Sequence, residues 1–267
     1  MSINDELGSR MKTYYEQIPK TRLMRRTPVA IRIDGKAFHT FTRGFQKPFD
    51  EVFGNAMART MEYLCQNIQG CVFGYTQSDE ITLILIDYQT FETSAWFDYE
   101  VQKLCSISAS MATMAFNRYF LDEYEKWYFD YIDFPMEFGC DEVSSANKKL
   151  DTAYCKVMSG AMFDARCFNI PKEEATNLVY WRQVDAQRNS IQMVGQANYS
   201  HNYLQDKTCA EIKELLQHDF GINWDGLPAR WKHGCAWTKE IGLDYNMPLL
   251  KGENRKYLDD LIFVGES

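Results

Sequence analysis

The sequence predicts an α+β protein with a ferredoxin-like (palm) β-α-β-β-α-β core and a mainly helical C-terminal extension. Strand-like runs and amphipathic helical patterns follow one another in that order. A short polar turn joins the second and third strands, which predicts a hairpin. The predicted elements are a strand at 28–33, a helix at 50–68, strands at 71–76 and 80–86, a helix at 95–120 and a strand at 162–170.

The first predicted strand and helix have clear boundaries. Pro28 opens the strand, where no ladder donor is lost. Asp50 is a favourable N-cap for the helix at 50–68, whose apolar residues recur on one face. Gly70 ends the helix, because glycine tolerates the left-handed conformation that follows a last turn.

The predicted helix at 95–120 carries small side chains on its inward face, which allow it to lie close to a sheet. An insertion of about residues 121–160 separates this helix from the fourth strand. Its first part is acidic and aromatic, and its stretch VSSANKKLD (143–151) is expected to be a loop. The insertion is expected to serve as a lid, a partner surface or a decoration of the core.

The chain after Pro171 is mainly helical in pattern. We expect a catalytic domain at 1–200, with its insertion, and an extension at 201–267 that packs on it. The predicted elements are helices at 172–183, 186–200 and 208–217 and a strand-like piece at 232–241. Thr208 and Glu211 have the spacing of a capping box.

The composition of the 267 residues is that of an ordinary globular protein, with 45% hydrophobic and 25% charged residues. The N-terminus has no apolar signal region and no run is long enough to cross a bilayer, so a cytoplasmic location is expected. The eight cysteines form no C-x-x-C pair and are expected to be buried free thiols. The net charge of −8 argues against nonspecific adhesion to nucleic acid. The basic stretch KTRLMRR (20–26) is expected to be a solvated surface.

Two aspartates are expected to meet at one end of the predicted sheet. Asp34 ends the first strand and Asp79 lies in the hairpin turn, while the first strand usually lies beside and antiparallel to the third. Two nearby carboxylates repel each other unless a cation lies between them. Oxygen ligands without a His/Cys cluster favour Mg²⁺, and two such ions support phosphoryl transfer.

The residues after Asp34 fit a triphosphate site. Gly35 allows close approach of the backbone, and the amides of residues 35–39 are candidates to cradle phosphates. Further candidate cations are Lys36, His39, Lys47 and Lys103. Each motif also has a plain structural explanation, because Asp34-Gly35 and Ser78-Asp79 are common turn sequences. Glu80 is a possible second carboxylate, although strand alternation points it away from Asp79.

These motifs together resemble the tRNA(His) guanylyltransferase superfamily. The resemblance covers about 28–120 and 162–195 and returns weakly in LPARWKHG (227–234). It is carried by RIDGKAFHTFT, KPFD, GYTQSDEITLIL, VQKLCSISASMA, FDARCFNIP and WRQVDAQRNSI. It implies an enzyme that adds nucleotides to the 5′ end of RNA in the 3′-to-5′ direction, after activation with ATP or GTP. It also implies tRNA as partner and a homotetramer.

The resemblance implies specific roles for matching positions. Asp34 and Asp79 would bind two Mg²⁺ ions, with the Gly35 carbonyl completing the ligand set, and Glu80 is a further catalytic candidate. Matching nucleotide contacts are Asp34, Gly35, Lys36, Ala37, Phe38, His39, Lys47, Ser78, Asp79, Lys103 and Asn189.

The chain departs from the eukaryotic enzymes in two places. Where they carry His-Ile-Asn-Asn-Leu-Tyr-Asn-Thr, this chain reads QRNSIQMV (187–194), with only Asn189 matching. The basic cluster before the second-helix lysine is replaced by Asp98, Tyr99 and Glu100. The chain therefore resembles the bacterial guanylyltransferase-like branch, which implies template-dependent repair of tRNA 5′ ends.

Alternatives remain open at the level of sequence. A palm-type nucleotidyl cyclase or dinucleotide synthase would use the same two aspartates without RNA. Guanosine addition specific to tRNA(His) is a second alternative, and a nucleotide-sensing or RNA-binding module without turnover is a third. The presence of both aspartates disfavours the last of these.

Overall fold

A six-stranded sheet in the order β4-β1-β3-β2-β5-β6 organises the chain, and every neighbouring pair of strands is antiparallel. The computed structural model describes residues 3–133 and 144–264. The strands are β1 (Val29–Gly35), β2 (Cys71–Gln77), β3 (Glu80–Leu85), β4 (Phe163–Asn169), β5 (Cys235–Thr238) and β6 (Gly242–Asp244). The protein is therefore a mixed α/β protein built on an antiparallel sheet.

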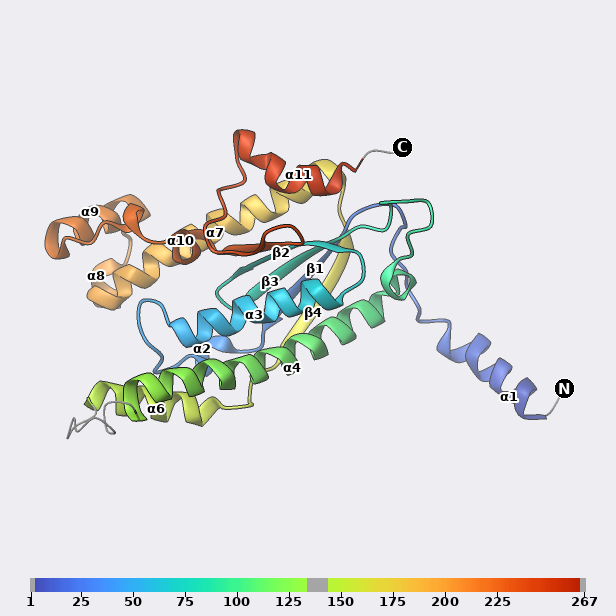
Figure 1. Cartoon of the computed structure of the whole chain (residues 1–267), viewed down its shortest axis with the longest axis horizontal. Coiled ribbons are helices and arrows are strands. Elements are labelled where there is room, and N and C mark those ends of the chain that lie inside the picture. Colours follow the sequence, from blue (N-terminus) through green and yellow to red (C-terminus); the bar gives the residue numbers. More distant parts are fainter. Residues whose placement is uncertain (1–2, 134–143, 265–267) are drawn as a thin grey trace.

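Helices cover both faces of this sheet (Figure 1). The α-helices of the described residues are α1 (Ile3–Met11), α2 (Phe38–Phe41), α3 (Glu51–Asn67), α4 (Val101–Tyr128), α6 (Ser145–Val157), α7 (Lys172–Asn198), α8 (His201–Leu204), α9 (Cys209–Phe220), α10 (Ala229–His233) and α11 (Lys256–Ile262). In Figure 1, α3 and α4 lie below the sheet and α7 and α11 lie above it, while α1 projects away from the body.

The two faces of β1 enter two different cores because successive side chains of a strand point to opposite sides. Ile31 and Ile33 are fully buried in the cluster that includes α3 and α4. Ala30 is fully buried in the cluster that includes α7 and α11. A third cluster, around Ile212 and Trp224, joins the C-terminal half of α7 to α9.

The predicted placement of the first and third strands is confirmed. β1 lies between β3 and β4, with Asp34 opposite Glu80 on one side and Asp164 on the other. β2 and β3 form the predicted hairpin, with Gln77 opposite Glu80, so its loop is Ser78-Asp79. The predicted cap of α3 is also confirmed, because the Asp50 carboxylate accepts a hydrogen bond from the amide of Phe53.

The prediction that a helix begins at residue 95 is wrong. A short 3-10 turn (Trp96–Tyr99) precedes α4, and Phe97, Asp98 and Tyr99 all have positive φ angles, of 49°, 52° and 54°. A left-handed backbone is unfavourable for residues other than glycine, so it persists only where its surroundings hold it. Helix α4 begins at Val101 and continues to Tyr128, beyond the predicted end at residue 120.

The basic stretch 20–26 holds that turn. Arg22 and Arg25 form ion pairs with Asp98, at 2.6 Å and 3.3 Å. Arg25 also donates from Nε to the buried carboxylate of Asp87, at 2.5 Å. Arg22 and Arg25 are therefore paired with acidic side chains of the same chain.

The prediction of a loop at 143–151 is wrong over its described part. Helix α6 occupies Ser145–Val157, and the hydroxyl of Ser144 caps it by accepting from the amide of Asn147. Ser144 and Ser145 are favourable N-cap residues, but the polar composition of the stretch favoured the prediction of a loop. The rest of the predicted insertion includes residues 134–143 and Cys140, which lie outside the described residues.

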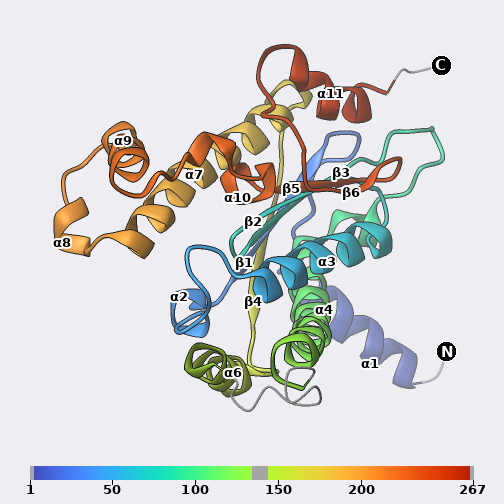
Figure 2. The same cartoon turned by 60° about the vertical axis from the view of Figure 1, so that its left-hand side comes forward.

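The C-terminal part also differs from prediction. Residues 172–198 form one helix, α7, in place of two, because no glycine or proline interrupts it near Val184. The predicted strand at 232–241 is confirmed only from Cys235, since His233 ends α10. Figure 2 shows β5 and β6 continuing the sheet beyond β2. The capping box of Thr208 and Glu211 is confirmed.

The expectation of buried free thiols is only partly met. The seven described cysteines are all free. Cys65 and Cys235 are buried, whereas Cys155 is exposed and the other four are intermediate. Within the described residues, no helix has the length and apolar character needed to cross a membrane.

Candidate functional site

The ends of β1 and β3 meet, as predicted. The amide of Gly35 donates to the carbonyl of Asp79 at 3.1 Å, which places the residues after Asp34 directly against the hairpin turn. The amide of Lys36 donates to the carbonyl of Met162 at 2.9 Å and fixes the other side. Asp34 and Asp79 therefore lie close together at one end of the sheet.

Both carboxyl groups are held where ionisation is unfavourable. Burial raises the pKa of Asp34, and the nearby charges of Glu80 and Asp164 raise it further. Burial also raises the pKa of Asp79, with a further contribution from Asp34. Among the described residues, neither carboxylate has a cationic partner in an ion pair.

Glu80 has a different environment from the two aspartates. Its oxygens accept from Arg32 Nη2 at 2.6 Å and from Arg182 Nε at 2.7 Å. The side chain is 5% exposed and both oxygens are occupied. The possible catalytic role of Glu80 stays a prediction, and in this structure the side chain serves as an anchor for two guanidinium groups.

A divalent cation fits the pair of aspartates. The described residues contain no group of three or more His, Cys, Asp or Glu side chains placed to hold a metal ion. The candidate ligands are therefore limited to the two carboxylates and the nearby Gly35 carbonyl. This small oxygen set suits Mg²⁺, which keeps several waters and is completed by substrate phosphates. Asp34, Asp79 and Gly35 stay the predicted ligands.

The segment after Asp34 offers fewer free amides than expected. Two of the five predicted cradle amides, those of Gly35 and Lys36, already donate to protein carbonyls. Ala37 adopts a left-handed conformation with φ of 56°. Phe38 is buried among aromatic rings, with Phe41 at 4.8 Å, whereas Lys36 and His39 are exposed. The cradle is thus reduced to the amides of residues 37–39.

The environment of Gly35 explains why a glycine is needed there. A β-carbon at this position would lie 2.3 Å from the ring of Phe38. The glycine therefore lets the chain turn back over this buried ring, a constraint that acts in addition to the predicted close approach of a ligand.

Two predicted lysines are placed very differently by the structure. Lys47 is exposed on the loop that joins α2 to α3. Lys103 lies near the start of α4, and its ammonium group sits 5.5 Å from the centre of the Phe97 ring. Ten residues further along α4, Thr113 accepts from the amide of Phe163, which is opposite Gly35. Ten helical residues span about 15 Å, so Lys103 lies well along α4 from this contact, and its role at the triphosphate stays a prediction.

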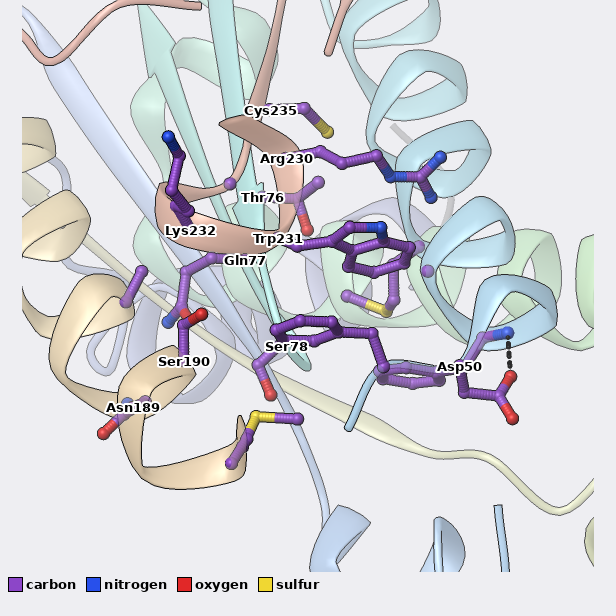
Figure 3. A pocket seen from close by; sticks show the side chains of 17 residues that line it. Asp50, Thr76, Gln77, Ser78, Asn189, Ser190, Arg230, Trp231, Lys232 and Cys235 are labelled. Atoms are coloured by element: carbon purple, nitrogen blue, oxygen red, sulfur yellow. Dashed lines mark hydrogen bonds between the residues drawn. The ribbon is translucent and has the colours of Figure 1, made fainter. Parts of the chain in front are cut away.

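A pocket opens beside the hairpin turn (Figure 3). Two predicted nucleotide contacts, Ser78 and Asn189, line it from the turn and from α7. Further walls come from the beginning of α3, the end of β2 and the segment 230–235. The pocket therefore gathers residues that are far apart in the sequence next to Asp79.

The segment 230–235 supplies residues that the sequence analysis did not select. The indole of Trp231 reaches into the pocket and stacks on Phe49, with ring centroids 5.1 Å apart and planes 9° apart. The guanidinium of Arg230 lies 4.2 Å from the centre of the same indole. Gln77 and Lys232 add polar groups to the lining. The only signal for Arg230, Trp231 and Lys232 was the weak motif match at 227–234, whereas Gln77 lies in the motif GYTQSDEITLIL.

Comparisons with known proteins agree on one family. A family model described as tRNAHis guanylyltransferase matches residues 8–171. The chain is 26% identical over 239 residues to the tRNA(His) guanylyltransferase of Schizosaccharomyces pombe, covering 85% of this chain and 78% of the other.

Solved structures give the same result. A bacterial tRNA(His) guanylyltransferase-like protein in complex with ATP has a TM-score of 0.78 and 34% identity, over 96% of this chain and 99% of the other. A bacterial guanylyltransferase-like protein in complex with GTP has a TM-score of 0.71 and 32% identity, with the same coverage.

Proposed function

Because the chain belongs to the tRNA(His) guanylyltransferase family and is a nucleotidyltransferase of that type, we propose that it extends tRNA at the 5′ end, in the 3′-to-5′ direction. The observation that carries this proposal is the meeting of Asp34 and Asp79 beside a pocket lined by Ser78 and Asn189. A 5′-monophosphorylated tRNA would first be activated with ATP or GTP. Activation would release pyrophosphate, and the 3′-hydroxyl of an incoming nucleotide would then attack the activated 5′-phosphate of the tRNA and displace the activating nucleoside monophosphate.

The sheet of β4, β1, β3 and β2, with α3 and α4 on one face, is proposed to act as a ferredoxin-like palm. Its strand ends would hold two Mg²⁺ ions through Asp34, Asp79 and the Gly35 carbonyl. Bound there, Mg²⁺ would neutralise phosphate charge and the charge of the two carboxylates. The raised pKa of both aspartates supports this, because a bound cation would offset both the burial of the carboxylates and the repulsion from neighbouring carboxylates.

The pocket is proposed to take the base of the activating nucleotide. Its stacked Phe49 and Trp231 offer a flat apolar wall, and Gln77 and Asn189 offer amide groups that donate and accept. Ser78 lies in the same turn as Asp79, so a nucleotide whose phosphates approach the aspartates would place its base in this pocket.

Template-dependent repair of tRNA 5′ ends is the proposed role. It is supported by the departure from the eukaryotic motif at 187–194 and by the similarity to the bacterial guanylyltransferase-like structures. A homotetramer in the cytoplasm is part of the same proposal. Exposed Tyr14, Tyr15 and Ile18, which are 63%, 65% and 74% exposed, offer an apolar surface for subunit contact.

A 5′-extension assay tests the function. Purified protein is incubated with Mg²⁺, ATP, GTP and 5′-monophosphorylated tRNA, either full-length or lacking the first nucleotide, while the opposing template base is varied. We expect the truncated tRNA to be extended with the complementary nucleotide, and Asp34→Asn to abolish extension. Equal guanosine addition opposite adenosine in full-length tRNA(His) would contradict the repair role. A cyclic or dinucleotide product from triphosphates alone would replace the proposal by the cyclase alternative.

A further inference from the structure

A buried ion pair connects the turn that carries Asp79 to helix α7. Glu80 follows Asp79 directly and binds Arg32 of β1 through one oxygen and Arg182 of α7 through the other. Arg182 is 8% exposed, so this contact lies inside the protein. An ion pair so placed is much less screened by solvent than a surface pair.

Arg182 extends the connection along α7. Its Nη2 donates to Oδ2 of Asp185 at 3.1 Å, while its Nε holds Glu80. The same Oδ2 accepts from Nδ2 of Asn189 at 3.4 Å. Asn189 lines the pocket beside the hairpin turn. An unbroken series of contacts therefore runs from the neighbour of Asp79 to the α7 wall of the pocket.

The planar guanidinium group suits this bridging position. It presents several donors in a fixed fork, so Arg182 binds two carboxylates at once and fixes the angle between them. Arg32 has no equivalent second contact, because its buried Nε has no partner among the described residues. The indole of Trp181 lies 4.7 Å from the Arg182 guanidinium and 5.5 Å from that of Arg32. This ring packs against both cations.

We propose that Arg182 is a positioning residue of the nucleotidyl transfer, which sets the α7 wall of the pocket in register with the two aspartates by bridging Glu80 and Asp185. The inference rests on the proposed function and adds to it a residue that touches neither the metal nor the nucleotide. A helix that shifts by a fraction of an ångström relative to the strand ends would move Asn189 away from a bound base.

A matched control exists at the opposite end of the same strand. Asp87 follows β3 at its other end, is 1% exposed and pairs with Nε of Arg25. Removing either arginine takes one charged partner from a buried carboxylate, which is destabilising, although Glu80 keeps Arg32 and Asp87 keeps the amide of Arg26. Arg25 does not line the pocket. A comparison of Arg182→Met with Arg25→Met therefore separates loss of stability from loss of positioning.

The experiment measures equilibrium binding of a non-hydrolysable ATP analogue in Mg²⁺ by calorimetry, together with the single-turnover rate of tRNA activation. We expect Arg182→Met to raise the dissociation constant about tenfold, which corresponds to about 1.4 kcal/mol, and to slow activation. Arg182→Lys is expected to recover part of the affinity, since it keeps the charge without the fork. Arg25→Met is expected to lower the melting temperature and leave the dissociation constant unchanged.

The outcomes are distinct. Equal dissociation constants for wild type and Arg182→Met, or equal losses in Arg182→Met and Arg25→Met, overturn the positioning role. If Arg182→Met does not fold, Asp185→Asn decides, because it keeps the Glu80 pair and removes the charge that binds Arg182; Arg188→Met, which removes only the other ion pair of Asp185, is its control. We expect the dissociation constant of the ATP analogue to rise about threefold in Asp185→Asn, and an unchanged dissociation constant overturns the inference. Wild-type protein that binds no ATP analogue would instead contradict the proposed function.

Discussion

At the scale of single residues, the site contains two carboxylates that repel each other, Asp34 and Asp79, and a third, Glu80, that is paired with cations. Glu80 has two guanidinium partners, whereas Asp34 and Asp79 have none among the described residues. The raised pKa of each aspartate means that the fold is less stable with both ionised. Residues placed at a cost to stability are typical of sites that await a ligand.

Asp79→Asn is therefore expected to stabilise the protein while it abolishes tRNA extension. The folded state raises the pKa of Asp79, so the wild type loses stability as pH rises through that pKa, and the neutral amide does not. In EDTA at pH 7 we expect a gain of about 1 kcal/mol, seen as a higher melting temperature. The gain should vanish below about pH 3, where the aspartate is protonated in both the folded and the unfolded state.

Exposed Asp130 provides the control for this experiment, since Asp130→Asn is expected to leave the melting temperature unchanged at either pH. Asp79→Asn that melts below wild type at pH 7 in EDTA would show that the carboxylate contributes to folding. The activity loss should reach roughly 10³-fold, or about 4 kcal/mol of transition-state stabilisation.

Gly234 is a second residue on which the pocket depends. Its φ is +87°, and a β-carbon there would lie 2.5 Å from the carbonyl oxygen of Thr76 in β2. Gly234→Ala is expected to lower the free energy of unfolding by roughly 3 kcal/mol or more, measured by urea denaturation.

A substitution at Gly242 separates the cost of the steric clash from the cost of backbone strain. It also has a positive φ, of +75°, but no atom lies within 4 Å of the position of its β-carbon. Gly242→Ala should therefore cost only the backbone strain of about 1 kcal/mol. Equal losses for both variants would show that the clash with β2 contributes nothing.

At the scale of elements, the rules for helix caps and turns predicted those boundaries that depend on residues close in the sequence. The cap at Asp50, the turn at Ser78-Asp79 and the capping box at Thr208 all follow from neighbouring residues. The turn at Trp96–Tyr99 does not, because Arg22 and Arg25 hold it from a segment some 70 residues earlier. Long-range ion pairs of this kind leave no periodic trace in the sequence.

The paired basic stretch gives a prediction about RNA. Arg22 is in an ion pair with Asp98, so its charge is largely neutralised locally. We expect Arg22→Ala to leave both the affinity for tRNA and its dependence on salt unchanged, measured by filter binding from 50 to 200 mM salt. A phosphate contact by Arg22 would instead reduce the log–log salt slope by about one.

At the scale of the whole molecule, the sequence was sufficient to place Asp34 and Asp79 together but not to place the start of the helix that carries Lys103. The first follows from the order of strands, which is preserved as β4-β1-β3-β2. The second depends on where α4 begins and in which direction it crosses the sheet, and the left-handed turn before Val101 changes that start. The pocket walls from Trp231 and Arg230 were missed because these residues lie more than 150 positions beyond the turn at Ser78.

That late contribution has a consequence for biosynthesis. The hydroxyl of Tyr75 in β2 donates to the carbonyl of His233, across 158 residues, and β5 then pairs with β2. During translation, β1, β2 and β3 leave the ribosome long before the strand that completes the edge of their sheet. Until residues 229–238 emerge, β2 is an unpaired edge and the pocket has no outer wall. A product truncated before residue 229 would therefore lack the wall that Arg230 and Trp231 give to the pocket.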